Sequence, residues 1–450
     1  MKQMKNKLIA GAALASLAFG LVACGDDSSS TVLVVGGDDT ELSSSSNDDA
    51  SSSSVKAESS SSVAKDASSS SAAKDESSSS VAKDESSSSA AKDESSSSVA
   101  EESSSSAEDV SSSSAEDVVT AAVFGSDYTT GELRWVINGN KLSEKSVAFF
   151  QDSKVIANGS DLYVLERMKA DNITKLNSKE LEEKGAEAVV WQISLDDNAN
   201  PTDMVFSGEN AWVALQNADS LVMISTKDGK ISKSIKTTEF AYEGETSPYI
   251  ADIELNDGKL YVLMQRYTMD PTTWATTYPE GLLAIYDAST GALKDTVQLL
   301  KKNPTAMTFF DGSIYVASQG EYNAAYGTDA DEERGIEKVN LAEKKSELVV
   351  SGKTLGGGIY AFVAEDGIAY AAVYKAYGNV PLAKVDLAAK KASTVEGIAD
   401  AEGSLAVKGG VVYVGDRSYG AEKIFVVKDG KATAVESVEG ALAPYSITLL

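Results

Sequence analysis

The segment 201–230 reads PTDMVFSGENAWVALQNADSLVMISTKDGK. It holds three short apolar runs, and a glycine turn at Gly208 separates the first two. The third run is followed by Asp228-Gly229, a dipeptide typical of a hairpin turn into a further strand. Short runs rich in β-branched and aromatic residues and bounded by turn signals predict β-strands. The segment therefore predicts most of a four-stranded antiparallel sheet.

The same unit recurs along the rest of the chain. In each copy an apolar run precedes a glycine turn, and an aromatic residue follows three or four positions after the glycine. The aromatic residues of the six copies are Tyr163, Trp212, Tyr261, Tyr315, Tyr370 and Tyr413. They lie 43 to 55 residues apart, which fits one propeller blade per copy. A sandwich or a parallel solenoid is the all-β alternative, but neither is expected to repeat this signature at this period.

The two ends of the repeat region supply a seventh unit. Ala443–Ile447 resembles the opening strands at Pro201–Met204 and Pro304–Met307, but no partner strands follow it. Between Val118 and Val147 the chain shows a second, a third and a fourth strand without a first. Joining these ends closes the ring and leaves no open edge to aggregate. We therefore predict an all-β fold for residues 118–450, a seven-bladed β-propeller closed by the C-terminal strand.

The units resemble the YVTN-type surface β-propellers of bacteria and archaea across nearly all of residues 118–450. The best local match is the opening segment, at Trp212–Asn217 and Met223–Ser225. Since the resemblance is to a repeat, it implies the fold and says little about function. The chain departs from the family after the second strand, where Asn217 has an arginine in its place in other units. These arginines are Arg167, Arg266 and Arg417.

Residues 1–23 are predicted to be a lipoprotein signal peptide. Three lysines precede an apolar run from Leu8 to Ala23, too short for a confident membrane span. The run ends Leu-Val-Ala-Cys-Gly, which resembles a bacterial lipobox and implies lipidation of Cys24. Acyl chains on this cysteine would anchor the protein stably to a membrane. We expect a cell-envelope protein on the outer membrane, displayed at the surface if Asp26 and Asp27 direct export; the same aspartates are compatible with inner-membrane retention.

Residues 24–117 are predicted to form a disordered tether after the lipidated cysteine. Nine Ser-Ser-Ser-Ser blocks alternate with short acidic units such as Val81–Glu85. The stretch has few apolar side chains to offset the entropy of ordering, and its negative charge extends it. We expect a stalk that lifts the propeller from the lipid surface, with serines that are open to glycosylation.

Composition removes several classes of function. The 450 residues contain no histidine and one cysteine, which excludes Ser-His-Asp and Cys-His catalysis and His-ligated metals. A single cysteine also excludes an internal disulfide and a Cys-rich zinc site. The formal net charge of −28 argues against binding nucleic acid. No cofactor is expected, and the protein is expected to be a monomer.

In a propeller, the loops between the second and third strands and those between blades share one face, together with the channel mouth. Here several of these loops are long, and four of the five arginines of the chain lie in them. Aromatic planes among polar groups suit sugar rings, and arginines suit carboxylates or other anions. The candidate ligand-binding residues are Arg167, Arg266, Tyr267, Trp274, Tyr278, Tyr322, Arg334, Tyr377, Arg417 and Tyr419.

One of these loops, residues 327–333, also carries four carboxylates. Their alternating oxygens would suit Ca²⁺, but the glycine and distal glutamate of an EF-hand loop are missing. A solvated acidic loop is the favoured interpretation, and we predict no other metal site.

Three functions remain open. The first is a non-catalytic, membrane-anchored binding protein that presents a site for an extracellular glycan, small molecule or protein on its upper loop face. The second is a hydrolase or lactonase that uses carboxylates, which for glycosides needs two acids about 5–10 Å apart. The third is a structural envelope protein.

Overall fold

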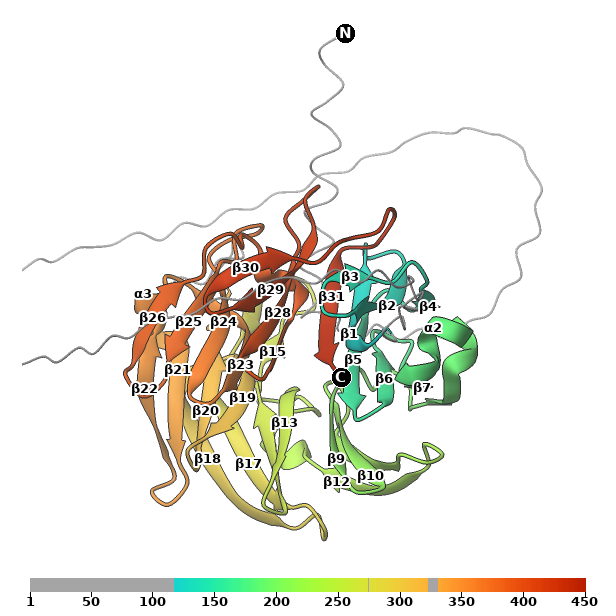
Figure 1. The fold of residues 1–450 in the computed structure, drawn as a ribbon. Coiled ribbons are helices and arrows are strands. Elements are labelled where there is room, and N and C mark those ends of the chain that lie inside the picture. The colour runs from blue at the N-terminus through green and yellow to red at the C-terminus, as the bar shows by residue number, and fades with distance from the viewer. Residues whose placement is uncertain (1–116, 274, 323–330) are drawn as a thin grey trace, which may run out of the picture. The chain divides into compact units, whose positions relative to one another are not determined.

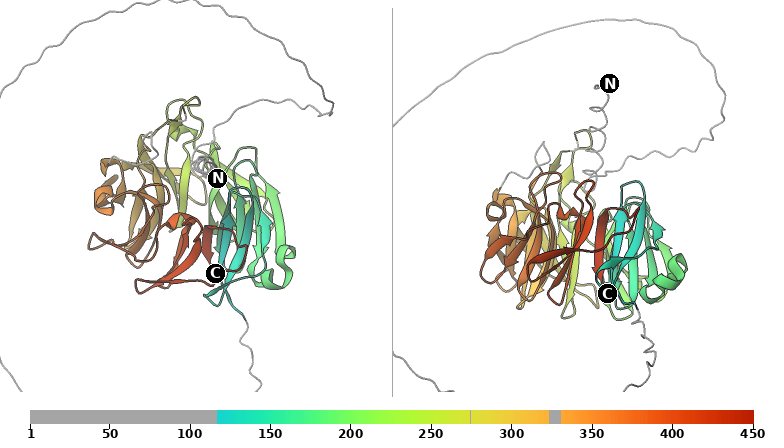
Figure 2. Two further views of the ribbon diagram at one scale, coloured as in Figure 1. Left: turned by 90° about the horizontal axis from the view of Figure 1, so that it is seen from above. Right: turned by 45° about the horizontal axis from the view of Figure 1, so that its top comes forward.

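The computed structural model describes residues 117–273, 275–322 and 331–450 (Figure 1). The predicted signal peptide, Cys24, all of the tether except its last residue, and Trp274 lie outside the described residues. Within them the chain forms seven antiparallel sheets arranged around a central axis, as the view from above shows (Figure 2). The prediction of a seven-bladed β-propeller is confirmed.

The sheets are numbered here as blades 1 to 7 in chain order, and their strands are given from the channel outward. Blade 1 consists of β31 (Pro444–Leu449), β1 (Val119–Ser126), β2 (Gly131–Ile137), β3 (Lys141–Leu142) and β4 (Val147–Phe149). Blade 2 consists of β5 (Ser153–Asn158), β6 (Asp161–Glu166), β7 (Asn172–Asn177) and β8 (Val189–Ser194). Blade 3 consists of β9 (Pro201–Ser207), β10 (Asn210–Leu215), β11 (Ser220–Ser225) and β12 (Ile231–Lys236).

The remaining four blades follow the same order. Blade 4 consists of β13 (Ile250–Asn256), β14 (Lys259–Met264), β17 (Glu280–Asp287) and β18 (Leu293–Lys302). Blade 5 consists of β19 (Pro304–Phe310), β20 (Ser313–Ser318), β21 (Gly335–Asn340) and β22 (Lys345–Ser351). Blade 6 consists of β23 (Gly358–Glu365), β24 (Ile368–Tyr374), β25 (Leu382–Asp386) and β26 (Lys391–Thr394). Blade 7 consists of β27 (Leu405–Lys408), β28 (Val411–Asp416), β29 (Lys423–Lys428) and β30 (Lys431–Ala434).

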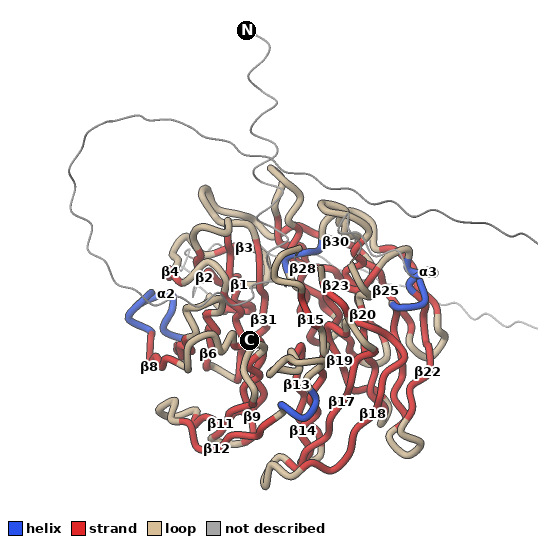
Figure 3. Tube along the Cα trace, turned by 180° about the vertical axis from the view of Figure 1, so that it is seen from behind, coloured by secondary structure: helices blue, strands red, loops and turns tan. Residues whose placement is uncertain are grey.

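Short elements decorate this ring (Figure 3). Between β7 and β8 lie η2 (Ser178–Glu180), α2 (Leu181–Lys184) and η3 (Gly185–Ala188). The small hairpin of β15 (Thr268–Met269) and β16 (Thr276–Thr277) projects from blade 4. The other short helices are η4 (Thr238–Phe240), η5 (Asp331–Glu333), α3 (Gly352–Leu355) and η6 (Ala401–Gly403). No helix in the described part of the chain is long and apolar enough to cross a membrane.

The repeated glycines form the hairpins between the first and second strands. In blade 4 both central residues of the turn, Asp257 and Gly258, have positive φ values, of 48° and 70°. This geometry requires residues that tolerate the left-handed region, and its twist matches that of the two strands. The glycine in the repeat signature is therefore explained by the turn.

The repeated aromatic residues form the contacts between blades. All six are buried, with exposed fractions of 6% or less. The ring of Tyr163 in blade 2 lies 5.0 Å from that of Phe206 in blade 3, and Tyr261 in blade 4 lies 4.8 Å from Phe309 in blade 5. The buried apolar side chains form seven clusters, and each cluster joins two neighbouring blades. The core is therefore divided among the blade interfaces.

The predicted closure of the ring is confirmed. Strand β31 pairs antiparallel with β1, with Val123 opposite Ile447 and Ala121 opposite Leu449 (Figures 1 and 2). On its other side β31 contacts β5 of blade 2, and it also packs against β27 of blade 7. The last strand of the chain thus completes the first blade and joins it to both neighbours.

We expect that shortening a side chain of this closing strand destabilises the whole domain. Ile447 is 5% exposed and packs between blades 7 and 1, so Ile447→Ala should lower the free energy of unfolding by about 2–5 kcal/mol. Leu348→Ala is the control, because Leu348 is 39% exposed on an outer strand. Urea unfolding followed by tryptophan fluorescence measures both, and equal effects of the two substitutions would contradict the role assigned to β31.

Candidate functional site

A cavity of about 600 Å³ occupies the central channel. Its lining comes from the first strands of all seven blades, together with Arg167 and Glu402 at the mouth. Charged side chains are unevenly distributed around it. Asp203 and Glu254 line the side formed by β9 and β13, whereas β19 and β23 contribute mainly small or apolar residues. The cavity thus has an acidic wall and a largely neutral wall.

The first strands are held together by bonds between side chains and backbone. Because each is the inner edge of its sheet, its channel-side N–H and C=O groups have no fifth strand to pair with. Ser446 of β31 accepts from Val155 N of β5 at 3.0 Å, and Ser404 beside β27 accepts from Ile447 N at 3.4 Å. On another side, Thr305 of β19 donates to the carbonyl oxygen of Ile359 of β23 at 3.0 Å.

Two of these bonding positions carry aspartates. Asp203 Oδ2 accepts from Ile253 N at 3.2 Å, and Asp252 Oδ2 accepts from Met307 N at 2.7 Å. The two carboxyl groups also hydrogen-bond to each other, and Lys154 Nζ lies 3.1 Å from Asp203 Oδ1. Lys154 therefore links blade 2 to the pair formed by blades 3 and 4.

The carboxyl groups of this cluster differ in pKa. Burial and the charge of Asp203 raise the pKa of Asp252 well above its usual value. Burial acts in the same direction on Asp203, but Lys154 and the hydrogen bond from Asp252 outweigh it and lower the pKa of Asp203. Asp252 therefore binds a proton more readily than Asp203, to which its carboxyl is hydrogen-bonded. Burial and Asp203 raise the pKa of the nearby Glu254 to about 7.

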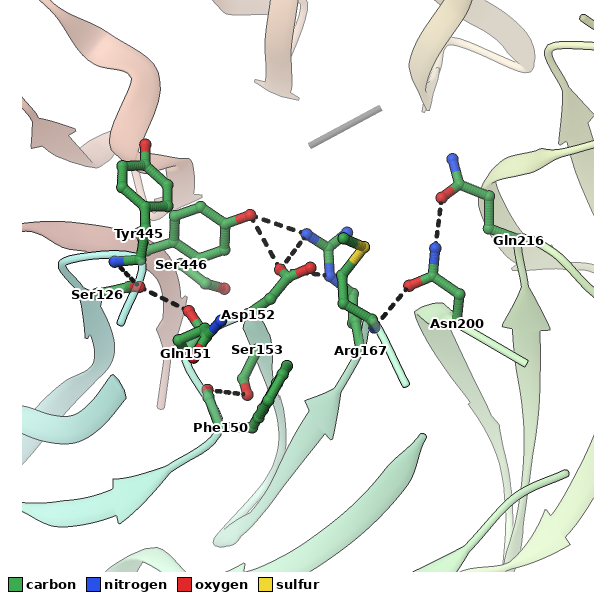
Figure 4. A network of polar contacts seen from close by, with 12 residues as sticks. Ser126, Phe150, Gln151, Asp152, Ser153, Arg167, Asn200, Gln216, Tyr445 and Ser446 are labelled. Atoms are coloured by element: carbon green, nitrogen blue, oxygen red, sulfur yellow. Dashed lines mark hydrogen bonds and ion pairs between the residues drawn. The ribbon is translucent and has the colours of Figure 1, made fainter. Parts of the chain in front are cut away.

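At the mouth, Arg167 joins the closing strand to blade 2 (Figure 4). Its Nε donates to Asp152 Oδ1 at 2.9 Å, and its Nη2 donates to the hydroxyl of Tyr445 at 2.8 Å. That hydroxyl in turn donates to Asp152 Oδ1 at 3.0 Å. Burial opposes the charge on Arg167, but Asp152 outweighs it and raises the pKa of the guanidinium.

Arg417 of blade 7 hydrogen-bonds to the start of the closing strand β31. Its Nη1 donates to the carbonyl oxygens of Ala443 and Pro444, at 3.2 and 2.9 Å, and its Nη2 donates to that of Ser126 at 3.1 Å. Its guanidinium carbon lies 4.8 Å from the ring centre of Tyr128 and 5.5 Å from that of Tyr445. Both arginines therefore fasten the ring as well as border the mouth.

A chain of amide side chains follows the opposite part of the mouth. Asn200 Nδ2 donates to Gln216 Oε1 at 2.8 Å, a contact visible in Figure 4. Gln216 Nε2 lies 3.5 Å from Gln265 Oε1, and Gln265 Nε2 donates to Asn303 Oδ1 at 2.7 Å. These glutamines directly follow β10 and β14, the register position that Arg167 and Arg417 occupy in their own blades.

Several other predicted site residues lie together beside the mouth. The ring of Tyr267 stacks on that of Tyr249 at 3.8 Å and tilts against that of Tyr278 at 5.1 Å. Tyr267 and Tyr278 are each 5% exposed, so their rings serve chiefly as packing surface. The ring of Tyr322 lies 6.2 Å from that of Tyr374, edge to face.

The remaining predicted residues do not join this group. Arg266 stands one residue beyond the register position of Arg167, and it donates to the carbonyl oxygen of Phe240 at 3.0 Å. Arg334 is 8% exposed and packs beneath Gly352. Tyr377 and Tyr419 are 57% and 99% exposed on outer loops. Trp274 lies outside the described residues.

The sequence prediction omitted the acidic residues that line the cavity, namely Asp203, Asp252, Glu254 and Glu402. A signal existed for two of them. Asp203 and Asp252 each occupy the third position of an otherwise mostly apolar first strand. A carboxyl group in a buried strand needs a hydrogen-bond or charge partner, which marks both positions as unusual. Glu402 lies in η6 within an irregular loop, where no periodicity marks it.

The acidic loop considered for Ca²⁺ lies mostly outside the described residues. Of its carboxylates, Glu333 pairs with Lys302 Nζ at 2.8 Å. In residues 117–273, 275–322 and 331–450, no group of three or more acidic side chains is arranged to hold a metal ion.

Comparison with known proteins gives only distant likenesses. No family model and no curated protein matches the chain. The apo structure of AztD from Citrobacter koseri aligns at 13% identity with a TM-score of 0.46, over 74% of this chain and 98% of AztD. A functionally unknown protein from Desulfotomaculum acetoxidans DSM 771 aligns at 13% identity with a TM-score of 0.49, over 74% and 99%. Both likenesses are too distant to bear on function.

The acidic wall predicts a pH dependence of stability. A carboxyl whose pKa is raised by folding stabilises the fold fully below its unfolded pKa, and this stability is lost as the pH rises through the folded pKa. For Glu254 this stability is lost between pH 4.5, its usual pKa, and about pH 7, its pKa in the folded protein. Between pH 4.5 and 7.5 the wild type should therefore lose on the order of 2 kcal/mol more unfolding free energy than Glu254→Gln.

Urea unfolding at several pH values measures this difference. Glu209→Gln is the control, because Glu209 is exposed in the turn between β9 and β10 and should leave the pH profile unchanged. If the difference in unfolding free energy between the wild type and Glu254→Gln stayed constant from pH 4.5 to 7.5, Glu254 would have its usual pKa in the folded protein.

Proposed function

We propose that this protein is a non-catalytic binding propeller that takes a small polar ligand into the mouth of its central channel. The observation that carries the proposal is the cavity of about 600 Å³, onto which charged and aromatic side chains from different blades converge. A mostly preformed concave site with a few convergent polar groups is the usual form of a ligand site. Carboxylates, a lysine, an arginine and tyrosines supply both donors and acceptors there.

The setting proposed for this site is the cell envelope. The lipobox-like sequence around Cys24 supports a lipid anchor, and the Ser-rich segment up to residue 117 supports a tether. The repeat pattern supports a place among surface propellers of the YVTN type. A tethered domain of this kind would present its channel mouth to ligands outside the membrane that holds it.

Glycoside hydrolysis is less well supported by the acids of the channel. Paired catalytic carboxyls in glycosidases stand about 5 Å or more apart, which leaves room for a sugar or a water between them. Asp203 and Asp252 instead hydrogen-bond directly to each other, and each also accepts from the backbone of the next blade. The contact favours a role in joining blades.

Blocking the channel tests the binding proposal. Ala361 lines the cavity on β23, so Ala361→Phe should fill the space above the neutral wall and abolish binding while the domain stays folded. A thermal-shift screen of glycans, amino acids and amines with the full chain identifies ligands, and calorimetry compares variants. Ala388→Phe, at an exposed turn, is the matched control. Ligands that bind Ala361→Phe as tightly as the wild type would place the site elsewhere.

Replacing Cys24 tests the anchor. Cys24→Ala removes the thiol that accepts lipid, so the protein should move from the membrane pellet to the soluble fraction. Protease added to intact cells then separates the two settings: the wild type is cleaved if it is surface-exposed and is protected if it faces the periplasm. Membrane association that survives Cys24→Ala would argue against a lipid anchor.

A further inference from the structure

Four tyrosines lie within electrostatic range of one carboxylate at the channel mouth. Burial raises the pKa of Tyr128, Tyr322, Tyr360 and Tyr374, and the charge of Glu402 raises each of them further. Glu402 is therefore within electrostatic reach of all four rings. It lines the cavity together with Tyr360. The four tyrosines come from blade 1, from blade 6 and from the loop after β20, so the fold brings them together from distant parts of the chain.

Glu402 has no counter-ion of its own. Among the described residues no hydrogen bond or ion pair involves its carboxylate, although it borders a cavity. Arg417 is near enough to lower its pKa, but the donors of Arg417 are bound to the carbonyl oxygens of Ser126, Ala443 and Pro444. The hydrogen bonds of Arg417 are therefore used in ring closure, and none of them reaches Glu402.

A second carboxylate nearby also lacks a partner. Asp400 is 4% exposed, and its Oδ1 has no hydrogen-bond partner in the described part of the chain. Burial and then Asp400 raise the pKa of Glu402 to about 7. Asp400 is also influenced by the charge of Asp416, and Arg417 is the cation that acts on both Asp400 and Glu402. The charge balance therefore favours a cation over an anion.

The tyrosine faces here already hold one cation. The guanidinium of Arg417 lies over the rings of Tyr128 and Tyr445 at 4.8 and 5.5 Å, within the range of cation–π attraction. Tyr322 and Tyr374 meet edge to face at 6.2 Å, an arrangement that leaves ring faces pointing in different directions. Aromatic faces around a carboxylate form the usual site for an ammonium group, because the rings attract the charge and tolerate its alkyl groups.

We propose that Glu402 and Tyr360, which both line the cavity, bind the ammonium group of a small organic cation. The inference rests on the proposed function and specifies the ligand class for the same mouth. Glu402 supplies the charge and the ring of Tyr360 supplies the cation–π surface. The rest of the ligand extends into the cavity.

Choline and its uncharged carbon isostere, 3,3-dimethylbutan-1-ol, are the probes. Isothermal titration calorimetry with the full chain should show choline binding at least about tenfold more tightly than the isostere. Glu402→Gln should weaken choline binding by about tenfold or more, and Glu209→Gln should leave it unchanged. Tyr360→Phe, which keeps the ring, should retain binding, whereas Tyr360→Leu should weaken it.

The pH dependence of choline affinity separates direct binding by Glu402 from a purely structural role, because a structural role would leave this dependence unchanged. Choline affinity in the wild type should rise between pH 6 and pH 8, as Glu402 ionises, and this rise should disappear in Glu402→Gln. Equal binding of choline and its isostere, or unchanged binding by Glu402→Gln, would overturn the inference. If a neutral ligand binds and is blocked by Ala361→Phe while choline does not bind, the channel site stands and the ammonium assignment falls.

Discussion

The structure depends on how seven inner edges are satisfied at once. Each first strand faces the channel with backbone groups that its own sheet cannot pair, and unpaired buried groups are costly. Side chains of the neighbouring first strand provide partners, as Ser446 does for Val155 N and Asp252 for Met307 N. The channel lining is therefore part of the framework that joins the blades. Any ligand that enters must contact residues that also hold the ring together.

Side chains at the channel mouth likewise help to hold the ring together. Arg167 lines the cavity and Arg417 lies near Glu402, yet each donates to residues of the closing strand or just beside it. Asp152 and Tyr445 complete this network on one side. With the arginines engaged in closure, the other charged side chains that line the cavity are Lys154, Asp203, Asp252, Glu254 and Glu402. The contacts that close the ring thus influence which charges remain at the channel mouth.

Much of this fold could be predicted from the sequence, because the glycine turn and the buried aromatic repeat in every complete unit. The incomplete units at the two ends also predicted the pairing of β31 with β1. The site was harder to predict. Arg167 directly follows its strand and lines the channel cavity, whereas Arg266 stands one residue later and donates to the carbonyl oxygen of Phe240. A sequence pattern does not place the end of a strand to one residue, and a shift of one residue reverses the direction of a side chain.

The late position of the closing strand affects how the protein is made. Ser446 accepts a hydrogen bond from Val155 N across 291 residues of chain, so blade 1 is completed only after residues 119–446 have been synthesised. While the ribosome is still at work, β1 exposes an edge that could pair with another nascent chain. Contacts this distant in sequence also make folding slow. The ring therefore stays open until β31 has been made and can pair with β1.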